Sequence, residues 1–552
     1  MEQPKLKILK TIGGVHGVSA IFPKFKDLID YEEGNIFINQ GYPRFVTHPV
    51  LKILENSYKR QFKAMGAISF HSYEVAIFFV IDFFLKNQNM MFFDDGLPLK
   101  FYNFLNEKFP NLIKKSNIDE AEILFLNSKE GKFPNYRIGK KNIGLLDGNE
   151  LSDIEKSKKF EILIQHDKQN DIGIVFIYDF KYLMFNALRR HCGFNVSSRK
   201  LVRNKIISPK ASNKLSLRLK SRLSELEKSK TEHCFLYPTG MAAIFTSIYS
   251  LFSIKRPKFI ALGSLYVDTL RILERWPENY TLSKTSFIRK DIIKNLENSV
   301  DESTAGIIVE IPSNPLIELV DIEKIIEIAH SKGVKVIVDN TIATPYNFNP
   351  FDYGVDIIVH STTKFLNGKN NHIGGVIFVN SDEISDSIRE FNNLTNLDMN
   401  PFDKRTLNRN LRKFEQRMKK INQNSEEVAK FLSQHKAVGN VYYPTLKDNP
   451  NYGFFEKYLS GGSGLLSFTL KESSVENASK FYDNVLNPIL KGPSLGSEKT
   501  LLSPYVIMAH YNDSEEKLEQ LGFDFYLMRI SVGIEPVDKI IKSLENGLKH
   551  VK

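Results

Sequence analysis

The sequence has little cysteine, and this scarcity excludes two classes of protein. Only Cys192 and Cys234 occur among the 552 residues, too few for a disulfide framework or for a cysteine-rich metal site. We therefore expect a reducing, cytoplasmic location and no bound metal.

No long apolar run is present either. The first ten residues, MEQPKLKILK, lack the apolar centre of a signal peptide, so we expect none. The run from Val75 to Leu85 contains Asp82 and is shorter than the roughly 20 residues that span a bilayer. We expect this run to form a buried helix or strand, and we expect no membrane partner.

The positive charge is not concentrated in one place. The formal net charge is +11, but lysine and arginine are mixed with acidic residues along the whole chain. A basic segment at residues 218–230 (RLKSRLSELEKSK) alternates in sign as a solvated helix face does. We therefore expect no nucleic-acid partner.

Two apolar runs end in polar residues that suit cofactor chemistry. Residues 334–338 (VKVIV) predict a buried parallel strand that ends at Asp339. The next strand, at residues 355–359 (VDIIV), is followed by Ser361, Thr363 and Lys364. Because ligands of open α/β sheets bind at the carboxyl ends of strands, we expect these ends to be neighbours around a ligand.

These residue types match the needs of an aldehyde cofactor. A lysine amine can form a Schiff base with the aldehyde, a carboxylate can keep a pyridine nitrogen protonated, and hydroxyls can bind a phosphate. Each residue alone also fits an ordinary turn or helix cap beside a solvated lysine.

Four further segments stand in a fixed order around these strands. They are YPTGMAA at 237–243, LYVDT at 265–269, EIPSNP at 310–315 and MRISVGIE at 528–535. Together with the strand ends, they resemble the motifs of the Cys/Met-metabolism family of pyridoxal phosphate enzymes. This family includes cystathionine γ-synthase, the cystathionine lyases and the sulfhydrylases, and the resemblance covers about residues 198–552.

The resemblance implies a cofactor, pyridoxal 5'-phosphate, and a set of residues that bind it. Gly240 and Met241 would offer backbone N–H groups to the phosphate at a helix start, together with the hydroxyls of Ser361 and Thr363. Tyr266 would stack on the cofactor ring, and Asn314 would bond near its phenolic oxygen.

The same resemblance implies the catalytic and substrate-binding residues. Lys364, Asp339 and Tyr266 form the expected catalytic set, with Lys364 as the Schiff-base lysine and Asp339 on the ring nitrogen. Arg529 would pair with the substrate α-carboxylate, because a planar guanidinium binds a carboxylate in bidentate fashion. Ser494, in the segment Ser494-Leu495-Gly496, would contact the same carboxylate. The next residues, SEKT at 497–500, depart from the family pattern and leave the distal pocket open.

One phosphate-binding motif is altered. Family members carry a Tyr-x-Arg pair that contacts the phosphate of the neighbouring subunit, and the matching place here is Ser197-Ser198-Arg199. Arg44, in Tyr42-Pro43-Arg44, has the family spacing and competes for this role. We prefer Arg199, because a predicted helix at 217–226 and the phosphate turn follow it in family order.

Other segments resemble one branch of the family, the fungal type of cystathionine γ-synthase, or O-succinylhomoserine (thiol)-lyase. They lie at residues 16–19, 31–34, 41–45, 492–505 and 509–511. This branch implies replacement of the acyl group of an O-acylhomoserine by cysteine, giving cystathionine for transsulfuration and methionine biosynthesis. A cystathionine lyase or homoserine sulfhydrylase remains an alternative, as does a non-catalytic scaffold.

The predicted architecture is α/β, a fold type I pyridoxal phosphate-dependent transferase with a mostly parallel sheet between helices. We expect an N-terminal α/β extension of unknown role (1–190) and a cofactor domain (191–390) in which strands alternate with amphipathic helices. A smaller C-terminal α+β domain (391–552) would complete the substrate site. We find no internal repeat. Since family members form their sites between subunits, we expect a homodimer or homotetramer.

Overall fold

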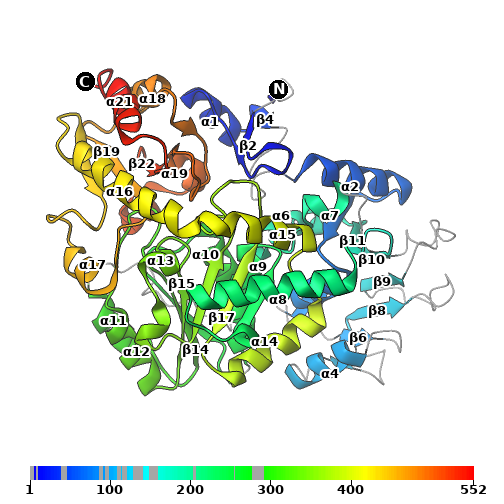
Figure 1. The fold of residues 1–552 in the computed structure, drawn as a ribbon. Helices are drawn as coiled ribbons and strands as arrows, with labels where there is room; N and C mark the ends of the chain where they lie inside the picture. Colours follow the sequence, from blue (N-terminus) through cyan, green and yellow to red (C-terminus); the bar gives the residue numbers. More distant parts are fainter. Residues whose placement is uncertain are drawn as a thin grey trace.

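The computed structural model of the chain describes residues 5–7, 10–38, 47–85, 91–93, 99–108, 113–114, 121–127, 141–147, 160–202, 207–253, 255–275 and 291–552. These residues form three larger sheets, of seven, six and five strands, and two small pairs, β1 with β4 and β2 with β3. Figure 1 shows the six-stranded sheet in the centre, between the seven-stranded and the five-stranded sheets. No helix in the described ranges combines the length and hydropathy that a membrane crossing needs.

The central sheet has the strand order β12-β17-β16-β15-β14-β13. Its strands are β12 (Cys234–Tyr237), β13 (Lys258–Leu262), β14 (Thr304–Glu310), β15 (Lys335–Asp339), β16 (Ile357–Ser361) and β17 (Gly375–Val379). Strand β17 runs antiparallel to both of its neighbours, and the other pairs are parallel. Strands β15 and β16 are the two predicted from the sequence, and they end at Asp339 and Ser361.

Alternate residues of these strands face opposite sides of the sheet. In β15, Ile337 packs into the core that contains α9 (Gly240–Leu251) and α14 (Asp382–Thr395). Val336 and Val338 pack into the core that contains α8 (Pro209–Leu226) and α12 (Ile322–Ser331). The other helices of this region are α10 (Val267–Arg275), α11 (Ile292–Ser299) and α13 (Thr344–Asn347). Because both faces are covered, a ligand can reach the sheet at its strand ends.

The seven-stranded sheet has the order β5-β11-β10-β9-β8-β6-β7. Its strands are β5 (Gly66–Phe70), β6 (Met91–Phe93), β7 (Ile113–Lys114), β8 (Ile123–Asn127), β9 (Lys141–Asp147), β10 (Ile162–Asp167) and β11 (Ile172–Ile177). Its helices are α3 (Tyr73–Leu85), α4 (Leu99–Lys108) and α6 (Phe185–Cys192). The run predicted as a buried helix or strand is α3, which contacts both its own sheet and α14. The central and seven-stranded sheets therefore share one hydrophobic core.

The five-stranded sheet has the order β18-β19-β22-β21-β20. Its strands are β18 (Val438–Tyr442), β19 (Leu465–Leu470), β20 (Leu490–Lys491), β21 (Leu501–Pro504) and β22 (Met528–Ser531). The helices of this part are α15 (Pro401–Asn410), α16 (Phe414–Ser433), α17 (Tyr452–Tyr458), α18 (Val475–Asn484), α19 (Tyr505–His510), α20 (Glu515–Leu521) and α21 (Val537–Leu548). The middle strand, β22, carries Arg529, which contacts Asn314 in the segment that follows β14 of the central sheet.

The residues predicted to form one N-terminal extension pack against two different sheets. The first part contains β1 (Lys5–Lys7), β2 (Thr11–Ile12), β3 (Ser19–Ala20), α1 (Phe25–Glu32) and β4 (Ile36–Ile38). Phe22, Phe25 and Leu28 share a core with the five-stranded sheet. Helix α2 (Pro49–Gln61) packs instead on β5 of the seven-stranded sheet, and α7 (Ser198–Val202) lies against α2.

Candidate active site

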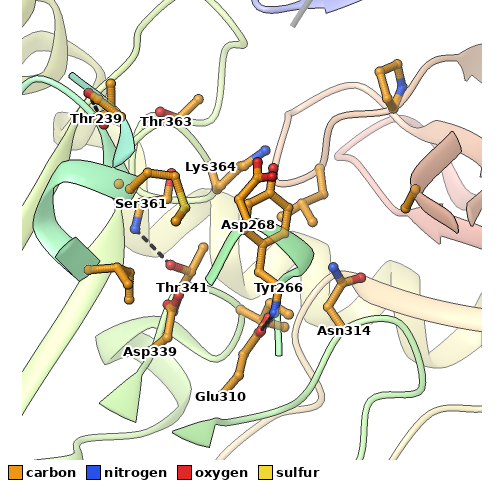
Figure 2. A pocket seen from close by; sticks show the side chains of 18 of the residues that line it. Thr239, Tyr266, Asp268, Glu310, Asn314, Asp339, Thr341, Ser361, Thr363 and Lys364 are labelled. Carbon is orange, nitrogen blue, oxygen red and sulfur yellow. Dashed lines mark hydrogen bonds between the residues drawn. The ribbon is translucent and has the colours of Figure 1, made fainter. Parts of the chain in front are cut away.

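A cavity lies at the carboxyl ends of β14, β15 and β16. Its lining combines these strand ends with the start of α9 and with carboxyl-terminal residues such as Pro493 and Arg529. Figure 2 shows side chains from the central sheet gathered around it. The lining includes Gly240, Met241, Tyr266, Asn314, Asp339, Ser361, Thr363, Lys364 and Arg529, all predicted as site residues. The structure thus brings together predicted residues that are up to 289 positions apart (529 − 240).

Asp339 is the last residue of β15, and the turn that follows holds its carboxylate. The Oδ1 atom accepts the N–H of Thr341 (3.0 Å), and the Thr341 hydroxyl accepts the N–H of Ser361 (2.8 Å). This pairing ties the ends of β15 and β16 together. Burial raises the pKa of Asp339 above its usual range, against the opposing effects of the Thr341 hydrogen bonds and of the nearby charges of His360 and Lys364. The site therefore has a buried acceptor that suits a cationic ligand atom.

Lys364 follows β16 and extends toward the carboxyl-terminal domain. Its backbone N–H donates to Ser361 O (3.2 Å), and its Nζ atom lies 3.5 Å from the Ser494 hydroxyl. Ser494 does not line the cavity itself; it is buried and donates to Asn370 Oδ1 (3.2 Å). The amine of Lys364 is thus placed between the two parts of the lining.

Helix α9 begins at the cavity with the predicted phosphate turn. The Thr239 side chain caps the helix by accepting the N–H of Ala242 (2.9 Å), which leaves the first N–H groups, those of Gly240 and Met241, without intrahelical acceptors. A Cβ atom on Gly240 would lie 2.8 Å from Ser361 Cβ, so only glycine fits there. The turn and the Ser361 hydroxyl together form a small cradle of hydrogen-bond donors.

Tyr266 is held over the cavity by a carboxylate beneath it. The Tyr266 N–H donates to Glu310 Oε2 (2.8 Å) at the end of β14. Burial, and then the nearby charge of Asp339, raise the pKa of Glu310 well above its usual range. Glu310 thus fixes the backbone of Tyr266 rather than acting as a free charge.

Arg529 lines the side of the cavity opposite the central sheet. Its Nη1 atom donates to Asn314 Oδ1 (3.1 Å) and its Nη2 atom to Pro493 O (2.6 Å). The guanidinium also lies over the Tyr505 ring, 4.9 Å from its centroid. These contacts hold a planar, bidentate donor in place at the cavity wall.

Gly496 allows the carboxyl-terminal domain to approach Lys364 closely. It has a φ of 75°, in the left-handed region, and a Cβ atom there would lie 2.4 Å from Phe365 N and 2.7 Å from Lys364 C. A residue with a side chain would therefore push against the backbone that carries the lysine.

With this geometry established, comparisons with known proteins identify the family. Residues 200–549 match the model of the family described as "Cys/Met metabolism PLP-dependent enzyme". The chain belongs to this family. It is therefore a pyridoxal phosphate-dependent enzyme of the transsulfuration family, and pyridoxal phosphate (PLP) is its cofactor.

Individual relatives within the family have different activities. The chain is 35% identical to cystathionine gamma-synthase of Neurospora crassa over 353 residues, which cover 62% of this chain and 55% of the relative. It is 31% identical to cystathionine beta-lyase of Lactococcus lactis subsp. cremoris over 319 residues, which cover 57% of this chain and 81% of the relative. A crystal structure of cystathionine gamma synthase from Xanthomonas oryzae pv. oryzae, in complex with aminoacrylate and cysteine, superimposes with a TM-score of 0.56 at 26% identity. It covers 61% of this chain and 86% of that chain. The predicted α/β fold of fold type I is confirmed.

The lining of the cavity fits PLP. The phosphate needs several hydrogen-bond donors, which the start of α9 and the hydroxyls of Ser361 and Thr363 provide. The ring nitrogen needs a carboxylate, and Asp339 at the end of β15 presents one to the cavity. The aldehyde needs an amine, and Lys364 presents it to the same cavity.

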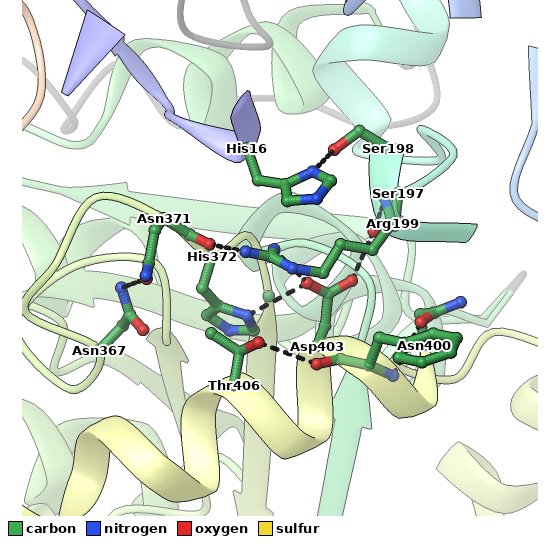
Figure 3. Close-up of polar contacts among 12 residues, drawn as sticks. His16, Ser197, Ser198, Arg199, Asn367, Asn371, His372, Asn400, Asp403 and Thr406 are labelled. Carbon is green, nitrogen blue, oxygen red and sulfur yellow. Dashed lines mark hydrogen bonds and ion pairs between the residues drawn. The ribbon is translucent and has the colours of Figure 1, made fainter. Parts of the chain in front are cut away.

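The structure does not bring Arg199 to this cavity. The Arg199 side chain is buried, its Nη1 atom pairs with Asp403 Oδ1 (2.8 Å), and its Nη2 atom donates to Asn371 O (Figure 3). Asp403 on α15 thus holds the guanidinium, and the contact of Arg199 with the phosphate of a neighbouring subunit remains a prediction. Its competitor Arg44 lies outside the described residues.

Several lining residues were missed by the sequence interpretation. Arg190 and Asn195 come from the segment after the seven-stranded sheet, and Tyr505 begins α19. Tyr505 stands in a segment that resembled the fungal branch, which was a usable signal. Arg190 and Asn195 had none, because no motif marks them.

Proposed function

We propose that this enzyme catalyses a γ-replacement, in which the acyloxy group of an O-acylhomoserine is exchanged for the sulfur of cysteine to give cystathionine and a free carboxylic acid. The observation that supports this most directly is the position of the Lys364 amine. It lies between the strand ends that suit PLP and the cavity wall with Arg529, and 3.5 Å from the Ser494 hydroxyl behind that wall. The higher identity to a fungal cystathionine gamma-synthase favours synthesis over cleavage.

In this proposal the strand ends bind the cofactor. The N–H groups of Gly240 and Met241, with the hydroxyls of Ser361 and Thr363, hold the phosphate. Asp339 keeps the ring nitrogen protonated, and Tyr266 stacks on the ring from the place that Glu310 fixes. When bound, PLP supplies an electron sink that stabilises a carbanion next to the substrate nitrogen.

The carboxyl-terminal wall orients the amino acid substrate. Arg529 exchanges its contact with Pro493 O for the substrate α-carboxylate, and the Ser494 hydroxyl supports the same group. This directs the Cα–H and Cβ–H bonds toward Lys364. The amine removes a proton at Cα and then acts at Cβ, while the acyl carboxylate leaves from Cγ. The cysteine thiol then loses its proton, which balances the charge of the released carboxylate, and its sulfur bonds to Cγ. Lys364 returns the other two protons to Cβ and Cα.

A direct assay separates the proposed reaction from its rivals. The purified protein with PLP is given O-succinyl-, O-acetyl- or O-phosphohomoserine, with and without cysteine, and cystathionine and 2-oxobutyrate are measured. Cystathionine that is lost in Lys364→Ala and kept in Lys420→Ala, an exposed lysine of α16, supports the proposal. Cleavage of added cystathionine without synthesis from any donor would make the enzyme a lyase. Turnover with sulfide alone in place of cysteine would make it a sulfhydrylase.

A further inference from the structure

The seven-stranded and the central sheets have the same strand order. In each sheet the first strand pairs with the last strand, and the last strand is antiparallel to both of its neighbours. The remaining strands follow in parallel, as β10-β9-β8-β6 in one sheet and β16-β15-β14-β13 in the other. Strand β7 only extends the first sheet at its far edge. Two sheets with this same unusual mixture of directions indicate a structural repeat, which the sequence analysis did not find.

Near the start of the two units, equivalent residues fall at a constant separation. Ser72 caps α3 by accepting the N–H of Val75 (3.0 Å), as Thr239 caps α9. The 167 positions between these caps (239 − 72) also separate the first residues of β6 and β13, at 91 and 258. The two units therefore align without insertions or deletions from the helix caps to the next strand, β6 in one unit and β13 in the other.

Two glycines in the antiparallel strands make the same close approach. A Cβ atom on Gly173 of β11 would lie 2.6 Å from Ser72 O. A Cβ atom on Gly375 of β17 would lie 2.3 Å from Thr239 O. In both units the last strand therefore passes against the carbonyl of the helix cap, and only glycine leaves room for it.

The contacts between the two units are reciprocal. The Ser72 hydroxyl donates to Thr395 O at the end of α14 (2.6 Å), and the Thr239 hydroxyl donates to Gly193 O just after α6 (2.8 Å). Helix α3 contacts α14, and α9 contacts α6. When two units contact each other through equivalent surfaces, they are related by a two-fold axis, as the subunits of a symmetric dimer are.

The centre of this interface is a pair of equivalent residues. Phe78 of α3 and Phe245 of α9 are separated by the same 167 positions, and their rings meet edge to face with centroids 6.2 Å apart. Around them lies the continuous apolar core of both sheets, as expected for a permanent subunit interface.

The first unit has lost the features that suit a cofactor. Tyr73 stands at the position of Gly240, and His166 pairs with Gly173 as Ser361 pairs with Gly375. The Tyr73 and His166 rings stack with centroids 5.1 Å apart and planes at 9°, so they fill the place of the phosphate cradle. The segment 362–374, which carries the lysine between β16 and β17, is shortened to residues 168–171.

The same unit nevertheless reaches the cavity of Lys364. Arg190, near the end of α6, and Asn195, just beyond it, belong to the lining. A Cβ atom on Gly193, between them, would lie 2.2 Å from Thr239 Oγ1. This segment is therefore in direct contact with the predicted phosphate turn.

We propose that residues 66–197 are a degenerate second copy of the cofactor domain that occupies the place of a dimer partner, so that one chain completes its own active site. Arg190 and Asn195 of this copy act as positioning residues, with the arginine adding positive charge near an anionic cofactor. The assignment of the cavity rests on the proposed function, but the repeat itself does not.

A hybrid experiment tests completion within one chain. Lys364→Ala and the double variant Arg190→Ala/Asn195→Ala are co-expressed with different tags, and species carrying both tags are isolated. They are assayed at a PLP concentration at which neither variant alone is active. If sites were shared between chains, a hybrid dimer would pair the intact lysine of one chain with the intact copy of the other. Such a hybrid would show about half the activity of wild type, or about one quarter for an unsorted mixture. We expect that the hybrid recovers no activity, or that no hybrid forms. Light scattering and mass spectrometry should then find the cofactor on a single chain.

Cofactor affinity provides a readout that does not depend on activity. Loss of the arginine is expected to weaken PLP binding by about 10- to 100-fold, measured by the absorbance of the bound cofactor. The single variant Arg190→Gln should show the same direction if the double variant unfolds, and Arg60→Ala, an exposed arginine on α2, should bind PLP as wild type does. Wild-type PLP affinity in both Arg190 variants, or activity recovered in the hybrid, would overturn the inference. A protein that binds PLP in this pattern yet makes no cystathionine would instead refute the proposed function alone.

Discussion

Replacing Gly496 by alanine tests how closely the carboxyl-terminal domain must approach Lys364. The left-handed backbone at this position costs an alanine about 1–2 kcal/mol. The added Cβ would also lie 2.4 Å from Phe365 N and 2.7 Å from Lys364 C, and backbone atoms cannot turn aside as a side chain can. Relieving these contacts requires a shift of the lysine segment of about 1 Å, and a misplacement of that size costs about 100-fold in rate. We expect kcat to fall by about that factor when PLP and both substrates are saturating.

Gly453 provides the matched control for this substitution. It lies in α17, its φ is not positive, and nothing is within 4 Å of the position of its Cβ. Gly453→Ala should therefore leave kcat unchanged and raise the free energy of unfolding by about 0.5–1 kcal/mol. If Gly496→Ala bound PLP and turned over at the wild-type rate, the close approach would have no part in placing the lysine, and the reasoning would fail.

Three further predictions concern single residues of the cavity. Lys364→Ala should abolish turnover and change the absorbance of bound PLP while leaving the protein folded, as circular dichroism and the spectrum would show. Arg529→Lys should raise KM for the O-acylhomoserine by about 10- to 100-fold with a smaller effect on kcat, because an ammonium cannot replace bidentate carboxylate binding, and steady-state kinetics would reveal it. Glu310 has a raised pKa in the folded protein, so its contribution to stability is present below its unfolded value near 4.5 and is lost as the pH rises through the folded value. Glu310→Gln should therefore make the Tm of the cofactor-free protein less dependent on pH above about 4.5. The amide oxygen of the glutamine can still accept the Tyr266 N–H, so this hydrogen bond is kept. An unchanged pH dependence of Tm would count against a raised pKa of Glu310.

The central sheet could be predicted because its signals are local. The β-branched run before Asp339 gives a buried strand, and the lysine stands shortly after the next such run. Patterns of this kind, which involve residues close together in the chain, can be recognised from the sequence alone. The structure adds the reason why the two strand ends stay together, which is the bond from the Ser361 N–H to the Thr341 hydroxyl.

The features that sequence reasoning missed depend on contacts between distant segments. Arg199 was assigned by its order along the chain, and nothing in the sequence indicated its ion pair with Asp403, which lies 204 residues away. The structural repeat was missed for a related reason. The two units share strand order, helix caps and two glycines at close approaches. Few side chains between these points are identical, chiefly Ala76-Ile77-Phe78 and Ile81, which match Ala243-Ile244-Phe245 and Ile248. Such a repeat is visible only once the strands have been paired.

Because Phe78 and Phe245 belong to one chain, the two sides of this interface can be substituted independently, which is not possible between identical subunits. In a homodimer a substitution on the two-fold axis changes both sides at once, so a variant must be tolerated twice in the same place. Here each ring is encoded separately, and either can change while the other stays. One half was therefore free to exchange a phosphate cradle for the stacked rings of Tyr73 and His166, while the other half kept its lysine. Covalent linkage in a single polypeptide thus permits a division of labour, in which one domain serves as scaffold and its neighbour as catalyst.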